Sequence, residues 1–167
     1  CNGILFNHES PIRGETFVTK KIVQGLIRIN QGYQKKLFLG NLYSKRDWGH
    51  ARDYVEAMWK MLQQKKPDDY VIGTGKTFTI KDFVNRTAKK MKLKIKWEGK
   101  GVKEQAINIE NKRVIIECRK RYFRPLEVDY LKGDALKAKK ILKWKPKISI
   151  DNLIDEMIQH ELKNIND

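Results

Sequence analysis

Three short polar segments carry residue types that could bind a phosphorylated ligand. The first runs from Asn7 to Glu15 and follows the apolar run Gly3-Ile4-Leu5-Phe6, which is typical of a short buried strand. Ligands of open α/β sheets lie beyond the carboxyl ends of strands, so this segment is well placed for a site. Asn7 offers an amide, His8 can donate to a ribose or phosphate oxygen, and Arg13 offers a fork that matches phosphate. The alternative is a polar loop with a capped turn and no ligand.

The second segment, from Lys45 to His50, lies between an expected strand and an expected helix. Arg46 beside Trp48 could hold an anion or stack on a base. In the alternative, Asp47 pairs with Arg46 or caps the following helix, and Trp48 is part of the core. The residues alone leave both interpretations open.

The third segment runs from Tyr122 to Asp129, where Arg124 and Glu127 stand three residues apart with Pro125 between them. Such a pair suits a nucleotide, because a guanidinium can bind the phosphates and a carboxylate can accept hydrogen bonds from ribose hydroxyls. The alternative is a surface ion pair of little energetic weight.

Other kinds of chemistry lack a sequence signal. The chain has no G-x-G-x-x-G, no G-x-x-x-x-G-K-[ST], no metal-spaced His or Cys cluster and no serine nucleophile elbow. Its two cysteines, Cys1 and Cys118, form neither a disulfide framework nor a zinc pattern. We therefore expect no metal site within this chain. With no signal peptide and no membrane-length apolar run, a cytoplasmic location is the default.

The formal net charge of +16 would permit a nucleic-acid, anionic-membrane or phosphate-bearing partner. The excess is mostly lysine in a chain that is also rich in Ile and Asn, which is typical of genome-wide composition bias. This favours lysines spread over solvated faces, with neither nucleic acid nor membrane as a partner. A basic nucleic-acid-binding module remains an alternative, and its binding would fall steeply with salt.

The apolar periodicity predicts an α/β fold with short strands. Strands are expected at residues 1–6, 37–39 and 70–72. Amphipathic helices are expected around residues 17–29, 54–62, 80–91, 136–142 and 150–162, with Thr79 and Asp82 as a capping box for the third and Ser149 as the cap of the last. Weaker strands are expected at 95–97 and 114–116, joined by a charged, irregular connection.

These elements lack the repeated strand–helix units of a complete doubly wound sheet. We expect the terminal strands and helices of a Rossmann-type sheet plus a small helix-rich C-terminal substrate domain. Residues 1–75 would form the end of the Rossmann-type domain, interleaved with substrate-binding segments, and residues 76–167 the substrate-binding domain.

Eight segments together are similar to the GDP-mannose 4,6-dehydratase family of extended short-chain dehydrogenases. The segments are Asn7 to Gly14, Phe17-Val18-Thr19, Gly40-Asn41, Lys45 to Trp59, Tyr70-Val71-Ile72, Trp97-Glu98-Gly99, Tyr122 to Asp129 and Trp144-Lys145-Pro146. The likeness runs in order from residue 1 almost to residue 160. The long match from Lys45 to Trp59 and the run Arg124-Pro125-x-Glu127-Val128-Asp129 make it specific.

The resemblance implies an N-terminal Rossmann domain that holds NADP and a smaller C-terminal domain that binds GDP-mannose. Hydride would leave C4 of the mannose for NADP, water would be lost across C5 and C6, and hydride would return to C6. The product would be GDP-4-keto-6-deoxymannose, on the way to GDP-fucose, and the intact protein would be a homo-oligomer (dimer or tetramer). Another extended short-chain enzyme, such as an epimerase, is an alternative.

By resemblance, His8 and Arg13 contact the cofactor. The positions that match the GDP-sugar site are Asn7, Val18, Lys21, Arg46, Arg124 and Glu127. We expect the two arginines of this set on the diphosphate and its glutamate on a ribose hydroxyl. Ile12 stands where family members often carry an arginine, which puts a second-arginine contact in doubt. The family's catalytic Thr, Glu and Tyr-x-x-x-Lys would precede residue 1, so we expect the chain alone to be inactive.

Overall fold

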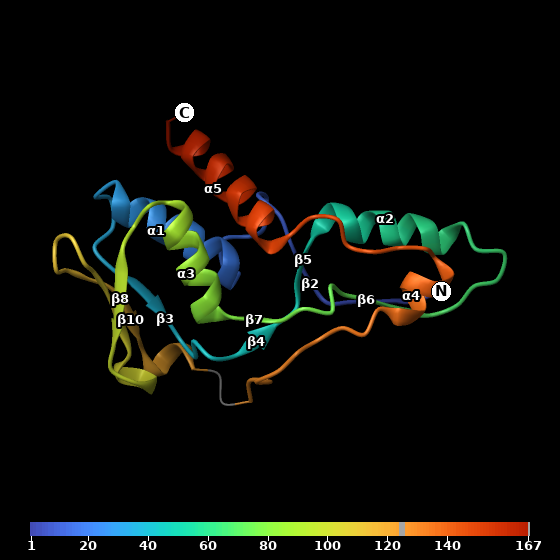
Figure 1. The fold of residues 1–167 in the computed structure, drawn as a ribbon, viewed down its shortest axis with the longest axis horizontal. Helices are drawn as coiled ribbons and strands as arrows, with labels where there is room; N and C mark the ends of the chain where they lie inside the picture. The colour runs from blue at the N-terminus through green and yellow to red at the C-terminus, as the bar shows by residue number, and fades with distance from the viewer. Residues whose placement is uncertain (124–125, 167) are drawn as a thin grey trace.

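Two hydrophobic cores lie toward opposite ends of an elongated molecule (Figure 1). The structure is a computed structural model that describes residues 1–123 and 126–166. Short strands between the two ends connect the cores, and these strands carry most of the polar segments singled out above.

The larger core is formed by a four-stranded sheet and three helices. The strand order is β3–β10–β9–β8, with β3 parallel to β10 and the other pairs antiparallel. The bounds are β3 Leu37–Leu39, β10 Val114–Cys118, β9 Gln105–Asn108, β8 Ile95–Glu98, α1 Val18–Asn30, α3 Ile80–Lys90 and α5 Ile150–Asn166. Helix α1 packs against both α5 and α3, and fully buried Leu26, Phe83 and Ile154 are part of this core.

Strand β9 replaces the irregular connection that the sequence predicts between β8 and β10. It pairs with β8 from Ile95 opposite Asn108 to Glu98 opposite Gln105, and with β10 on its other side. Ala106 and Asn108 are buried, whereas Gln105 and Ile107 are partly exposed. The two-residue alternation in burial is therefore present, but Ile107 and Asn108 conceal it, because an apolar residue lies on the more exposed face and a polar one on the buried face.

The smaller core contains a two-stranded parallel sheet of β1 (Gly3–Leu5) and β6 (Tyr70–Ile72). Helices α2 (Ala51–Leu62) and α4 (Leu136–Ile141) contribute Tyr54, Ala57 and Ala138, and Trp144 completes the cluster. The indole Nε1 of Trp144 donates to the backbone oxygen of Asp53 at 2.7 Å. Both cores take residues from before and after residue 75, and the division into 1–75 and 76–167 stays a prediction.

Two further strand pairs lie between the cores. Strand β2 (Asn7–Glu9) runs parallel to β5 (Trp48–His50), and β4 (Lys45–Arg46) runs antiparallel to β7 (Phe78–Thr79). The short helical turns η1 (Gly101–Lys103) and η2 (Lys120–Tyr122) complete the element order. None of the helices in the described part of the chain has the length and apolarity needed to cross a membrane.

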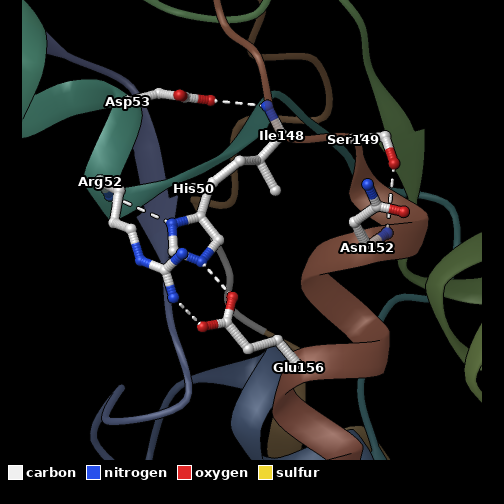
Figure 2. A network of polar contacts seen from close by, with 7 residues as sticks. All are labelled: His50, Arg52, Asp53, Ile148, Ser149, Asn152 and Glu156. Carbon is white, nitrogen blue, oxygen red and sulfur yellow. Dashed lines mark hydrogen bonds and ion pairs between the residues drawn. The ribbon is translucent and has the colours of Figure 1, made fainter.

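The predicted caps of α3 and α5 are confirmed. The hydroxyl of Thr79 accepts from the N–H of Asp82 at 2.9 Å, and the Asp82 carboxylate accepts from the N–H of Thr79 at 3.0 Å. The Ser149 hydroxyl accepts from the N–H of Asn152 at 3.1 Å, just inside the start of α5 (Figure 2).

A polar network fixes α5 to the start of α2 (Figure 2). His50 caps α2, because its Nδ1 accepts from the N–H of Arg52 at 3.1 Å. Its Nε2 therefore carries the proton and donates to the Glu156 carboxylate at 2.7 Å, and Arg52 pairs with the same carboxylate. Asp53 accepts from the N–H of Ile148, at 3.0 Å, in the segment that leads into α5.

Candidate functional site

Five side chains that the sequence predicts for the GDP-sugar site line one cavity of about 580 Å³. They are Asn7, Val18, Lys21, Arg46 and Glu127. We call this cavity the Arg46 cavity. Its wall also includes Glu9, Asn41 and Tyr122. Residues more than a hundred positions apart in the sequence therefore meet at one place.

Each contributing element explains part of this convergence. Asn7 lies on β2, Arg46 on β4, and Val18 and Lys21 on the first turns of α1. Glu127 follows η2 along the chain and belongs to a segment that returns along β4. The first turn of α1 contains no acidic residue, but the Glu9 carboxylate on β2 accepts from the hydroxyl of Thr19 in that turn at 2.7 Å.

Arg46 is the best-anchored cation of the cavity. Its Nη1 donates to the backbone oxygens of Lys45 at 2.9 Å and Val128 at 2.6 Å, and its Nη2 donates to Glu127 Oε1 at 2.9 Å. A guanidinium has five N–H donors, so two remain for a ligand. The contacts hold the side chain in one orientation, which lowers the entropic cost of binding an anion.

Lys21 and Arg121 form a second basic group around Tyr122. The Lys21 ammonium lies 4.1 Å from the centre of the Tyr122 ring, and the Arg121 guanidinium lies 4.8 Å from it. Lys21 donates to the backbone oxygen of Phe38 at 2.7 Å. Burial, and then the charge of Arg121, lower the pKa of Lys21 below its ordinary value of 10.5.

Gly40 allows η2 to close this side of the cavity. A Cβ on Gly40 would lie 2.1 Å from the backbone oxygen of Tyr122, so a larger residue would push η2 away. The glycine is required by this close approach of two backbones.

A second cavity, of about 350 Å³, contains both residues that the resemblance assigns to the cofactor. We call it the His8 cavity. His8 and Arg13 line it together with the apolar run from Ile4 and with Leu131. Successive residues of a strand point to opposite faces, which explains why His8 lines this cavity and Glu9 the other. Asn7 lines both cavities, so they adjoin along β2.

Glu9 and Arg13 form an ion pair at the boundary between the two cavities. The Arg13 Nε lies 3.1 Å from Glu9 Oε2, and its guanidinium stacks 3.5 Å above the Phe17 ring. The Thr19 hydroxyl donates to the same carboxylate at 2.7 Å. Burial raises the pKa of Glu9 above 4.5, and the bond from Thr19 and the charge of Arg13 oppose that rise without cancelling it.

The remaining predictions have mixed outcomes. Arg124 lies outside the described residues, so its role stays a prediction. Asp47 neither pairs with Arg46 nor caps α2, because Glu127 pairs with Arg46 and His50 is the cap. Trp48 is 2% exposed and packs against Phe83 as part of the core. Ile12, in place of the family's arginine, is 84% exposed.

Glu9 and Tyr122 lie inside the first and third predicted segments, but sequence reasoning singled out neither as a site residue, and Arg121 lies one residue before the third segment. For Arg121 and Tyr122, the nearby Arg124-Pro125-x-Glu127 run was the available signal. Glu9 gave none, because only the fold shows that its carboxylate is buried. Within residues 1–123 and 126–166, no three His, Cys, Asp or Glu side chains gather closely enough to hold a metal ion.

Known sequences give a consistent picture. A sequence model of the family described as GDP-mannose 4,6 dehydratase matches residues 1–157. A GDP-mannose 4,6 dehydratase of Dictyostelium discoideum is 50% identical over 165 residues, which are 99% of this chain and 46% of that protein. GDP-mannose 4,6 dehydratase 1 of Arabidopsis thaliana is 52% identical over 163 residues, 98% of this chain and 40% of that protein. The chain thus spans less than half the length of these relatives.

Solved structures agree on the fold. RMD from Pseudomonas aeruginosa, complexed with NADPH, superposes with a TM-score of 0.78 at 18% identity, over 97% of this chain and 48% of that one. A dTDP-glucose 4,6-dehydratase from Bacillus anthracis in complex with NAD superposes with a TM-score of 0.73 at 19% identity, over 98% and 44%. These likenesses confirm the α/β fold class. Because the family model covers most of the chain, this chain belongs to the GDP-mannose 4,6-dehydratase family.

Proposed function

We propose that this chain is the GDP-sugar-binding part of a GDP-mannose 4,6-dehydratase. The observation that carries the proposal is the Arg46 cavity, where Asn7, Val18, Lys21, Arg46 and Glu127 converge. Relatives that are 46–52% identical and carry this enzyme name favour a dehydratase over an epimerase. The structural neighbours, at less than 20% identity, bear on the fold alone.

The side chains of the cavity suit a nucleoside diphosphate. The two remaining donors of Arg46 are matched to diphosphate oxygens, and Lys21 adds a second positive charge on the neighbouring wall. Glu127 uses one carboxylate oxygen on Arg46, which leaves the other for a ribose hydroxyl. Arg124 is proposed as the second arginine on the diphosphate.

The cofactor would occupy the adjoining cavity, against His8 and Arg13. Both residues fit this role, because Glu9 and Phe17 hold the guanidinium in place and Asn7 joins the two cavities. We propose NADP, which supplies hydride acceptance at the start of the cycle and hydride return at its end. The groups that move the protons are expected outside these 167 residues, so the chain alone is inactive.

The wider role also follows the resemblance. The whole enzyme converts GDP-mannose to GDP-4-keto-6-deoxymannose in the cytoplasm, as a homo-oligomer (dimer or tetramer), on the route to GDP-fucose. Neither nucleic acid nor membrane is a proposed partner.

Binding of GDP to the purified chain tests the proposal. We expect isothermal titration to show one site, and Arg46→Ala to weaken it about tenfold or more, since a lost charge-assisted hydrogen bond costs about 1.5–3 kcal/mol. Arg86→Ala is the matched control, because Arg86 also makes an ion pair, with Asp151 at 2.8 Å, and lies outside both cavities.

Two outcomes would contradict the proposal. The first is absence of GDP binding by the folded chain, and the second is UDP binding as tight as GDP binding. A separate assay with GDP-mannose and NADP should give no product from the chain alone, and measurable turnover would refute the expected inactivity.

A further inference from the structure

Asp47, which stands between Arg46 and Trp48 in the sequence, is fully buried, and its described hydrogen bonds come from neither of these neighbours. It accepts four hydrogen bonds of 2.6–3.0 Å. The N–H and hydroxyl of Thr74 donate to Oδ1, and the N–H groups of Gly75 and Gly133 donate to Oδ2. The carboxylate therefore joins three segments of the chain without an ion pair among the described residues.

The two segments that meet at Asp47 cross at very short range. A Cβ on Gly73 would lie 3.0 Å from the Cα of Gly133 and 3.1 Å from Asp47 Oδ2. A Cβ on Gly133 would lie 3.0 Å from both Gly73 Cα and Phe6 Cδ2. Backbone atoms therefore meet at this crossing, and the Asp47 carboxylate accepts hydrogen bonds from both of the crossing segments.

Residues 127–133 form the second of these segments, and a series of contacts fixes them along β4. Glu127 bonds Arg46, the N–H of Lys45 donates to the Asp129 oxygen at 2.7 Å, and the N–H of Leu131 donates to the Lys45 oxygen at 3.1 Å. The bond from Gly133 to Asp47 fixes the far end. The position of Glu127 relative to Arg46 therefore depends on how this segment is held along β4.

We propose that Asp47 is a positioning residue for the nucleoside diphosphate, acting through the segment that sets Glu127 against Arg46. This inference rests on the proposed function, because it takes the Arg46 cavity as the GDP site. It also assigns a role to an acid that lines neither the Arg46 cavity nor the His8 cavity.

The chemistry of the contacts requires a carboxylate. An ionised Asp is acceptor-only on both oxygens, whereas Asn presents an NH₂ group at one of the two positions. In Asp47→Asn, an NH₂ group that faces Thr74 would lose only the backbone bond, because the Thr74 hydroxyl can turn and accept from it, and the bonds from Gly75 and Gly133 would remain. Asp47→Ala removes all four bonds, including the anchor of residues 127–133, and is therefore the sharper test.

The test compares Asp47→Ala with Asp53→Ala in the 167-residue chain. Asp53 is also buried and accepts from two backbone N–H groups, that of Lys147 at 2.9 Å and that of Ile148 at 3.0 Å. Figure 2 shows the bond from Ile148. Each variant thus removes a carboxylate that bonds backbone N–H groups, but only the first involves the segment beside β4. Both are measured at a temperature at which circular dichroism shows them folded.

We expect Asp47→Ala to raise the Kd for GDP about tenfold or more, and Asp53→Ala to leave it within about twofold. Without ligand, amide hydrogen exchange at Lys45 and Leu131 should accelerate in the first variant and not in the second. An unchanged Kd in folded Asp47→Ala, or unchanged exchange at both amides, would overturn the inference. Failure of the unsubstituted chain to bind GDP would instead refute the proposed function, and the exchange data would still test the positioning.

Asp47→Asn decides the matter if Asp47→Ala does not fold, because its amide oxygen still accepts from one pair of donors. Hydrogen exchange at Gly133 shows whether that residue has lost its bond to position 47. The inference requires exchange at Lys45 and Leu131 to change together with exchange at Gly133. Faster exchange at Gly133 with no change at Lys45 and Leu131, or the reverse, would overturn it.

Discussion

The two ends of the molecule differ in how completely their apolar surface is covered. The larger core has four paired strands and three helices packed on one another. The smaller core has a two-stranded parallel sheet whose other face exposes Ile4, although parallel sheets are ordinarily covered on both faces. Helix α2 also exposes an apolar stripe at helical spacing, made of Val55, Met58, Trp59 and Leu62.

This difference assigns different tasks to the two ends. The larger core contains more buried apolar residues than the smaller one, and its end of the molecule provides α1 and η2 to the Arg46 cavity. The smaller end carries the β1 run that lines the His8 cavity and leaves an uncovered apolar surface of the kind that marks interfaces. Stability and the proposed diphosphate site should therefore depend chiefly on the larger end.

The largest expected difference between the two ends comes from replacing one large aromatic residue at each end by alanine. Phe83→Ala should cost about 3–5 kcal/mol in the free energy of unfolding, because its ring is 0% exposed. Trp59→Ala should change it by less than about 0.5 kcal/mol, because its ring is 61% exposed. Urea unfolding measures both values. A large cost for Trp59→Ala would mean that the α2 stripe is covered in solution, and a concentration-dependent Tm would then identify a second copy as the cover.

Much of the larger end could be predicted from the sequence, because its elements obey simple periodicities. Strand β3 and helix α3 have the predicted apolar pattern, and the capping box of α3 follows from two residues three apart. Strand β9 could not be predicted, because partly exposed Ile107 and buried Asn108 hide its alternation. It is set by tertiary pairing with β8 and β10, and such pairing is not visible locally.

The candidate site was likewise predictable from the sequence only in part. Arg46 and Glu127 were predicted as residues of one site, and the fold brings them into an ion pair 81 positions apart in sequence. The role of Asp47 could not be read from the sequence. Its four donors come from segments that begin 27 and 86 residues downstream, and three of those donors are backbone N–H groups that carry no sequence signal.

A buried ion pair inside the larger core gives the next largest effect. Lys20 on α1 bonds Glu161 on α5, and both side chains are almost completely buried. Glu161→Gln should cost about 3 kcal/mol at neutral pH, because it leaves the lysine charge without its partner. Urea unfolding of both proteins at neutral pH measures this difference.

The same pair predicts a pH dependence. Burial pushes the pKa of Glu161 upward, but hydrogen bonds from Lys20 and Gln24 and the charge of Lys20 outweigh it and leave the pKa below 4.5. The folded state then binds fewer protons than the unfolded state. The stabilisation that this ion pair contributes is present above about pH 4.5 and is lost as the pH falls through the folded-state pKa of Glu161. Glu9 acts in the opposite direction, because burial raises its pKa. If Glu161→Gln lost as much free energy of unfolding on acidification as the unsubstituted chain, another carboxylate would be the source of that loss.

The smallest predicted effect concerns the connection between the two ends. His50→Ala removes the cap of α2 and the bond to Glu156, and should cost about 2 kcal/mol, because a cap and a charge-assisted bond are lost at a partly exposed carboxylate. Arg52→Ala is the control and should cost less than about 0.5 kcal/mol, since the Arg52 side chain is 70% exposed.

Hydrogen exchange shows where the lost stability resides. If the His50 network couples the two ends, His50→Ala should speed exchange at Tyr70 in β6 far more than at Phe83 in α3. The smaller core then loses one of its attachments to α5, whereas the larger core keeps its own packing. Equal acceleration at both amides would mean that the molecule unfolds as one unit, and the difference in coverage between its ends would then have no consequence for stability.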